Sequence, residues 1–184
     1  MTPRVEVLCP GRIRRNGKVV LEAHSTVSLI ACADHRIIVD TSSRENRAIL
    51  VEALRDVRLD AKDVDILVNT HGHHDHTENN DLFPAARKVL GPLGRMNEEG
   101  AHLAEGVWLV PTPGHTEDSI SVFVDAELRY AIVGDAIPTQ DNFLRWVPPG
   151  LNYDERVALD SMERIVHFAQ VIIPGHGPAF PVDR

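Results

Sequence analysis

The stretch that decides the fold places histidines and an aspartate directly after an aliphatic segment: Val68-Asn69-Thr70-His71-Gly72-His73-His74-Asp75-His76-Thr77. The segment that leads into it, Asp65-Ile66-Leu67-Val68, is short, apolar and bounded by polar residues, which predicts a buried strand. The side chains with metal-binding chemistry therefore follow the carboxyl end of a strand, where α/β proteins usually place their reactive groups. Imidazole and carboxylate ligands suit zinc, and also iron or manganese.

The spacing of the candidate ligands in this loop indicates two neighbouring metal ions. His71 and His73 are two residues apart, so in extended backbone their side chains point the same way. Asp75 and His76 follow at once and cannot both share that direction. We therefore expect one metal ion on the first pair and another on the second pair. Further residues of ligand type occur downstream, which argues against a polar loop that is rich in histidine by chance.

Each downstream candidate lies at a rigid turn or at the end of a predicted strand. His115 follows the turn Pro113-Gly114, whose restricted backbone holds the imidazole with little freedom, as a metal ligand requires. Asp135 ends an apolar strand, and His176 follows the turn Pro174-Gly175. The chain thus delivers further ligand-type side chains from separate strand ends.

In order and context these motifs resemble those of the metallo-β-lactamase fold hydrolases. The resemblance covers about residues 25–180 and is carried by Ile38-Val39-Asp40-Thr41, the His71–His76 run, Thr112-Pro113-Gly114-His115-Thr116, Gly134-Asp135-Ala136 and Pro174-Gly175-His176-Gly177. Each motif alone is weak, whereas all of them in this order are specific. The resemblance implies an α/β protein, a four-layer αββα sandwich of two mixed β-sheets, as a single domain over residues 1–184.

The resemblance also implies metal ligands in two overlapping sets. The set for a first ion is His71, His73 and His115, and the set for a second ion is Asp75, His76 and His176. Asp135 would bridge the two ions. Asp40 would support the metal loop through hydrogen bonds, a need that metal sites generally have, unless it only ends a turn.

Two such cations, about 3.5–4 Å apart, share a water molecule and lower its pKa from about 15.7 toward neutrality. The resulting metal-bridging hydroxide attacks a carbonyl carbon or a phosphorus atom. Asp75 is the candidate catalytic residue, because a carboxylate there can orient the hydroxide or carry its proton. We therefore predict a dinuclear hydrolase with two divalent ions, zinc first and iron or manganese as alternatives, acting on a small ester, thioester or lactone.

Two other activities stay open at this point. The resemblance is closest to a small group of family members that is linked to RNA cleavage, through Asp81-Leu82-Phe83-Pro84 and Val171–Pro178, so a phosphodiesterase or ribonuclease is one alternative. The other is a mononuclear iron persulfide dioxygenase, which shares the motifs but holds one iron through two histidines and an aspartate. A non-catalytic scaffold is disfavoured, because no ligand of the set is missing.

Composition and charge limit the class of protein and the partners that can be expected. The 184 residues are 43% apolar and 25% charged, as in one globular domain with a full core. The net charge is −8 and no basic block occurs, which disfavours nucleic acid as a partner without excluding it. No segment approaches the about 18 apolar residues of a membrane span, and no signal peptide is recognisable. We expect a cytoplasmic protein with a small-molecule substrate, with a homodimer left open.

Hydrophobic periodicity predicts the remaining elements. The predicted strands are 4–8, 18–22, 25–31, 36–40, 65–68, 87–90, 106–110, 119–124, 130–134 and 170–173, and the predicted helices are 44–57 and 152–168. Ser42 and Glu45 resemble a capping box. The segment 91–106 reads as a long loop that either borders the substrate or lies free on the surface.

A second loop, at 137–150, is predicted to lie over the site. Phe143, Arg145 and Trp146 are its candidates for substrate contact, with core packing or a dimer contact as the alternative. The remaining histidines are expected to be surface or locally bonded residues: His24, His35, His74, His102 and His167. Cys9 and Cys32 lack the spacing of metal ligands and are expected as buried thiols.

Overall fold

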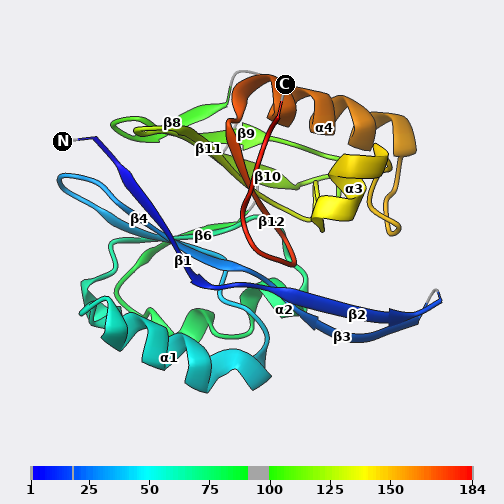
Figure 1. Ribbon diagram of the computed structural model, residues 1–184. Coiled ribbons are helices and arrows are strands. Elements are labelled where there is room, and N and C mark those ends of the chain that lie inside the picture. Colours follow the sequence, from blue (N-terminus) through cyan, green and yellow to red (C-terminus); the bar gives the residue numbers. More distant parts are fainter. Residues whose placement is uncertain (1, 18, 91–99, 184) are drawn as a thin grey trace.

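The computed structural model describes residues 2–17, 19–90 and 100–183. Within these residues, a five-stranded and a six-stranded β-sheet pack face to face, and helices cover their outer faces (Figure 1). This is the αββα sandwich that the sequence predicted. In the described part of the chain, none of the helices has the length and apolarity to span a membrane.

The first sheet is mixed and carries the histidine-rich loop. Its strands, in spatial order, are β1 (Arg4–Cys9), β4 (Val27–Ala31), β5 (Arg36–Val39), β6 (Ile66–Asn69) and β7 (Arg87–Leu90). The pairs β1–β4 and β4–β5 are antiparallel, whereas β5–β6 and β6–β7 are parallel. The crossover from β5 to β6 runs through the turn η1 (Arg44–Asn46), the helix α1 (Arg47–Asp56) and the turn η2 (Ala61–Asp63). The parallel pairing places the carboxyl ends of β5 and β6 at one edge.

The second sheet is also mixed and supplies the downstream candidates. Its strands, in spatial order, are β13 (Phe180–Pro181), β12 (Val171–Pro174), β11 (Arg129–Gly134), β10 (Ile120–Asp125), β9 (Val107–Pro111) and β8 (Ala101–Ala104). Helices α3 (Gln140–Arg145) and α4 (Glu155–Phe168) connect β11 to β12, which pair in parallel. The carboxyl ends of β11 and β12 therefore meet at the same edge of this sheet.

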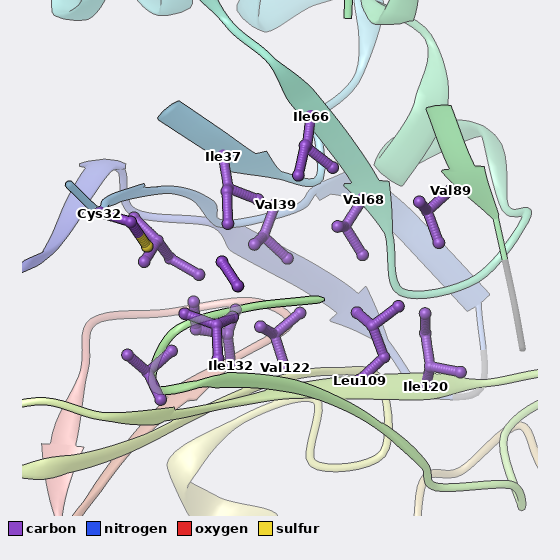
Figure 2. Close-up of a cluster of buried hydrophobic side chains, with 14 of the residues drawn as sticks. Cys32, Ile37, Val39, Ile66, Val68, Val89, Leu109, Ile120, Val122 and Ile132 are labelled. Carbon is purple, nitrogen blue, oxygen red and sulfur yellow. The ribbon is translucent and has the colours of Figure 1, made fainter. Parts of the chain in front are cut away.

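Alternation along the strands divides the apolar side chains between three buried layers. On β5, Ile37 and Val39 enter the layer between the two sheets, whereas Ile38 enters the layer under α1. Figure 2 shows side chains of both sheets, among them Val68 and Val122, pointing toward one another in the central layer. The third layer packs α4 against the second sheet. Each such side chain contributes about 1.5–3 kcal/mol when fully buried, which stabilises the relative placement of the sheets.

A two-stranded hairpin, β2 (Arg12–Asn16) and β3 (Val19–His24), projects from the sandwich (Figure 1). The pattern of Val and Leu in 4–8 and 18–22, with Gly11 and Asn16-Gly17 between them, predicts two strands joined by a turn, and that connection is wrong. The turn at Asn16-Gly17 joins β3 to β2, an additional strand, while β1 pairs with β4. Strand β2 was not predicted because its side chains are polar and largely exposed, so its sequence shows no apolar alternation.

Three further expectations about connecting segments need correction. The segment 137–150 is not a plain loop, because Gln140–Arg145 form α3. The predicted loop 91–106 contains β8 at Ala101–Ala104, and its residues 91–99 lie outside the described residues. The capping box is wrong, because Ser43 precedes η1 and makes no side-chain cap, while Ser42 has a φ of 62°. These segments lack the long periodic patterns that mark the core elements.

Candidate metal centre

The histidine-rich loop starts where β6 ends and closes into one helical turn, α2 (His74–Thr77). His73 stands before this turn in extended backbone, so its side chain departs in a different direction from those of the turn. The hydroxyl of Thr77 donates to the carbonyl oxygen of His73 at 3.1 Å and fixes the start of the turn. One short segment thereby presents ligand-type groups on two sides.

The first candidate half-site consists of His71, His73 and His115. Nδ1 of His73 lies 3.0 Å from Nε2 of His71 and 2.9 Å from Nε2 of His115. The three nitrogen atoms lie within 4.8 Å of one another, although His115 comes from the other sheet. Three imidazole nitrogens converging in this way form the ligand set of a single divalent cation.

The second candidate half-site consists of Asp75, His76 and His176. Oδ2 of Asp75 lies 3.9 Å from Nε2 of His76 and 3.5 Å from Nε2 of His176. His176 reaches the site from the loop after β12, so this half-site also joins both sheets. His76 and His176 are almost completely buried, whereas the Asp75 side chain is 23% exposed.

Asp135, at the end of β11, lies between the two half-sites. Its Oδ1 is 3.4 Å from Nε2 of His76 and 3.2 Å from Nε2 of His176. Its Oδ2 is 3.5 Å from Nε2 of His115. The two oxygen atoms of one carboxylate therefore face different half-sites, which is the arrangement a bridging ligand requires.

Four of the histidines turn Nε2 toward the site and place Nδ1 against an oxygen atom: His71, His76, His115 and His176. Nδ1 of His76 lies 2.8 Å from Asp40 Oδ2, and Nδ1 of His71 lies 3.2 Å from Thr70 Oγ1. Nδ1 of His115 lies 2.6 Å from the carbonyl oxygen of Leu151, and that of His176 lies 2.9 Å from the carbonyl oxygen of His24. Such partners fix the tautomer and the ring orientation, and leave Nε2 free for a metal ion.

The pKa values of the two half-sites shift in opposite directions. Burial, helped by neighbouring histidines, lowers the pKa of His71 to about 2, and burial also lowers that of His73. Burial alone would lower the pKa of His76, but the carboxylates of Asp40 and Asp135 raise it well above 6.5. Burial would raise the pKa of Asp135, but the facing rings of His176 and His76 hold it well below its usual range. His76, between two carboxylates, is therefore held more readily in its protonated form than His71 and His73 are.

Two buried atoms that lie between the half-sites bear on whether metal ions fit there. Nε2 of His76 and Oδ1 of Asp135 have no hydrogen-bond partner, although both are buried. An unsatisfied buried polar atom costs about 1–3 kcal/mol, and a divalent cation between them would satisfy both. Nitrogen and carboxylate oxygen donors in these proportions suit zinc. The residues present fit a pair of divalent metal ions.

Comparison with known proteins identifies the family. The model of the metallo-beta-lactamase superfamily matches residues 22–106. A probable metallo-hydrolase of Methanocaldococcus jannaschii is 34% identical over 177 residues, which are 94% of this chain and 86% of that protein. Metallo-beta-lactamase domain-containing protein 1 of Xenopus laevis is 33% identical, over 97% of this chain and 81% of that protein. The chain belongs to the metallo-β-lactamase superfamily.

Solved structures of this superfamily share the fold. A metallo-beta-lactamase-type protein of Thermotoga maritima has a TM-score of 0.77 and 20% identity, over 98% of this chain and 100% of that one. The B. thuringiensis protein AiiA, solved with N-decanoyl-L-homoserine at its active site, has a TM-score of 0.69 and 19% identity, over 96% of this chain and 94% of that one. The family and the fold class predicted from the motifs are thus confirmed, and the chain is a metal-dependent hydrolase.

All the predicted metal ligands lie close together in the structure. The three predicted substrate contacts have different surroundings from one another. Phe143 packs into the layer between α4 and the second sheet, with its ring 5.3 Å from that of Phe180. Arg145 is exposed and lies 4.0 Å from Asp141. Trp146 follows α3 and is 44% exposed. Phe143 is partly buried in this layer, while Arg145 and Trp146 are exposed, and contact with a substrate stays a prediction for all three.

Three groups that hold the Nδ1 atoms of candidate ligands were not predicted from the sequence: the hydroxyl of Thr70 and the carbonyls of His24 and Leu151. Thr70 stands directly before His71, and its position in the motif was a signal that could have been used. The carbonyls of His24 and Leu151 carry no signal, because any residue supplies a backbone oxygen. His74 was expected to be a surface or locally bonded residue, and its side chain is 96% exposed.

Proposed function

We propose that this protein is a dinuclear hydrolase, with zinc as the first candidate ion, that cleaves a small ester, thioester or lactone. The observation that carries the proposal is the position of Asp135, whose two oxygens face two separate sets of ligands. Two complete sets of ligands, with one carboxylate facing both, can hold two ions. The mononuclear iron dioxygenase shares the same motifs, so the metal content of the protein separates the two possibilities.

The first ion would be held by His71, His73 and His115, the second by Asp75, His76 and His176, with Asp135 shared. When bound, a pair of divalent ions supplies Lewis acidity for the electrophile and lowers the pKa of a water molecule. The low pKa of His71 keeps its imidazole neutral and ready to bind a cation at ordinary pH. The raised pKa of His76 means that a cation there replaces a proton.

Asp75 is the best-placed residue to handle the proton of the reaction. Its side chain is 23% exposed, whereas that of Asp135 is only 10% exposed and is enclosed by histidines. A carboxylate at the edge of the centre can take a proton from an attacking water and return it to the leaving group. This assigns Asp75 a role in the reaction in addition to binding.

A small pocket, lined by none of the proposed metal ligands, is a candidate place for the part of the substrate that lies away from the reacting bond. A cavity of about 240 Å³ lies between the hairpin and α3, and it is lined by Ile13, Arg15, Pro138, Thr139, Asn142 and Gly150. The carbonyl oxygen of Pro138, one of these lining residues, accepts a hydrogen bond from the backbone N–H of His176 at 2.7 Å. An acyl or lactone group fits such a volume. The homoserine derivative bound to AiiA makes lactones the first class to assay.

Metal analysis of protein purified without added metal, followed by a substrate panel, tests the proposal. We expect about two zinc ions per chain and turnover of lactones or esters that is lost in His71→Ala and Asp75→Ala. About one iron per chain, with oxygen uptake on glutathione persulfide, would overturn it in favour of a dioxygenase. Cleavage of phosphodiesters alone would overturn the substrate class and leave the dinuclear centre in place.

A further inference from the structure

The last residue of β3 and the two residues that join β3 to β4, here called the junction (His24–Thr26), contact both loops of the second half-site. The backbone N–H of Ser25 donates to the carbonyl oxygen of Asp75 at 3.0 Å. The backbone N–H of Thr26 donates to the carbonyl oxygen of Gly175 at 2.7 Å. The carbonyl oxygen of His24 accepts from Nδ1 of His176 at 2.9 Å. Consecutive residues thus bond the loop of Asp75, the loop of His176 and the His176 ring itself.

The side chain of Thr26 adds a further bond to the same loop. Its buried hydroxyl donates to the carbonyl oxygen of Gly177 at 3.1 Å and accepts from the backbone N–H of Gly11 at 3.0 Å. Gly11 packs so closely that a Cβ there would lie 2.4 Å from the Thr26 nitrogen and 2.7 Å from the Gly175 oxygen. Since these neighbours are backbone atoms, the junction and the loop after β12 have little room to separate.

The junction is itself anchored on its outer side. The ring of His24 lies between Ser43 and Glu22, with Nδ1 2.5 Å from Ser43 Oγ and Nε2 3.3 Å from Glu22 Oε1. The hydroxyl of Ser25 accepts from the backbone N–H of Ser42 at 3.2 Å. The junction is therefore fixed to the hairpin and to the segment before α1. These anchors hold the position of the groups that contact the second half-site.

The first half-site is held from a different part of the chain. Nδ1 of His115 donates to the carbonyl oxygen of Leu151, and the backbone N–H of Tyr153 donates to the carbonyl oxygen of Gly114 at 2.9 Å. The segment that holds His115, residues 151–153, is thus separate from the junction that holds His176 and the loop of Asp75. A change in one support can affect its own half-site without moving the other.

We propose that the junction positions the second half-site, so that loosening it weakens the binding of the second metal ion while the first stays bound. This inference rests on the proposed dinuclear centre. In the junction, Thr26 is the positioning residue that can be tested by substitution, because its hydroxyl bonds to the His176 loop and does not itself face the ligand atoms.

The experiment compares Thr26→Val with the wild-type chain by calorimetric titration of the metal-free protein with zinc. Valine keeps the shape of threonine and removes the hydroxyl. Loss of a supporting hydrogen bond typically weakens metal binding about 10–100-fold, so we expect that loss in the second binding event only. Titration with cobalt gives an independent readout, since the spectrum at one equivalent should be unchanged and that at two equivalents weakened. Thr26→Ser should restore both.

Ser121→Ala is the control. Ser121 is also buried and lies on β10 outside the ligand motifs, where its hydroxyl bonds to Thr112 Oγ1 at 2.8 Å. It should lower thermal stability by a similar amount and leave both binding events unchanged. If Thr26→Val does not fold, His24→Ala, which removes the ring anchor, replaces it with the same expectation.

The outcomes separate this inference from the proposed function. If the wild-type chain binds two ions and Thr26→Val binds both as tightly, the junction has no positioning role and the inference is wrong. Equal weakening of both events would also overturn it, because the effect would not be confined to the second half-site. If the wild-type chain binds a single ion, the dinuclear proposal fails and this inference fails with it.

Discussion

The carboxylate of Asp40 accepts a hydrogen bond from Nδ1 of the buried His76 at 2.8 Å, which ties a candidate metal ligand to the neighbouring strand. Asp40 follows β5 with a φ of 58°, a left-handed conformation that costs a non-glycine residue about 1–3 kcal/mol. Its carboxylate also accepts from the backbone N–H and the hydroxyl of Thr70, both at 2.8 Å. These bonds hold the residue in its strained position and orient two parts of the metal loop at once.

Asp40→Asn should therefore weaken the second half-site. The amide has the same shape, but it lacks the charge that raises the pKa of His76 and can present a donor where an acceptor is needed. We expect a loss of about 10–100-fold in zinc affinity at that half-site, measured by competition with a chelator. Asp34→Asn, the same change in the exposed turn before β5, should bind zinc like the wild-type chain. Equal affinities in the two variants would show that Asp40 only ends a turn.

Zinc binding should release protons from the second half-site and few from the first. The pKa values of His76 and His176 are raised, so these rings carry protons that a cation must displace, whereas the pKa of His71 is lowered to about 2. Titration calorimetry in buffers of different ionisation enthalpy measures the protons released. Asp75→Ala, which leaves the first set complete, should release fewer than the wild-type chain. Equal release in both would contradict the assignment.

The same shifts predict how the stability of the metal-free protein varies with pH. A histidine whose pKa is raised by folding contributes stability that is fully present below its unfolded pKa, about 6.5, and is lost as the pH rises through the folded value. His76 and His176 therefore predict that the metal-free protein loses stability above about pH 6.5. Thermal unfolding in a chelating buffer from pH 6 to 9 measures this, with saturating zinc as the control. A flat profile without metal would contradict it.

The candidate ligands could be predicted from the sequence, whereas the groups that hydrogen-bond to their loops could not. His71, His73 and Asp75 are close in the chain, and the strand before them has a strong apolar pattern, so their placement followed from local signals. The supports depend on backbone atoms brought together over long distances, such as Thr26 and Gly177, which are 151 residues apart. The hairpin was misassigned for a related reason, because its exposed polar strand has no apolar alternation to mark it. Local patterns report which face of an element is buried, but not which distant carbonyl it meets.

Gly175→Ala should disrupt the bridging carboxylate. A Cβ at Gly175 would lie 2.1 Å from Asp135 Oδ1, so either the loop after β12 or the carboxylate must move. Overpacking of this kind costs about 1–3 kcal/mol, and here it displaces a carboxylate that faces both half-sites. We expect loss of zinc binding beyond one ion, measured by elemental analysis after dialysis. Gly72→Ala is the control, since a Cβ between His71 and His73 meets nothing within 4 Å. Matching metal contents in the two variants would contradict the prediction.

Substitutions in and after α3 should separate the partly buried candidate for substrate contact from the exposed ones. Phe143 is half-buried against the ring of Phe180, so Phe143→Ala should lower the free energy of unfolding by about 1–3 kcal/mol, less than the about 3–5 kcal/mol of a fully buried phenylalanine. Arg145 has an exposed side chain and a 4.0 Å ion pair, so Arg145→Ala should change that free energy by less than about 0.5 kcal/mol. Chemical denaturation measures both.

Unlike Phe143, Trp146 is an exposed aromatic residue; it follows α3 and has a φ of 52°. An apolar side chain in this position can cover the acyl part of a substrate, because Asn142 of the same helix lines the pocket between the hairpin and α3 that is the candidate place for this part. Trp146→Ala should therefore raise KM for lactones with long acyl chains more than for those with short ones, at unchanged zinc content. Steady-state kinetics over a series of chain lengths measures this, with Arg145→Ala as the comparison. A KM that rises equally for all chain lengths would show that Trp146 does not contact the acyl group.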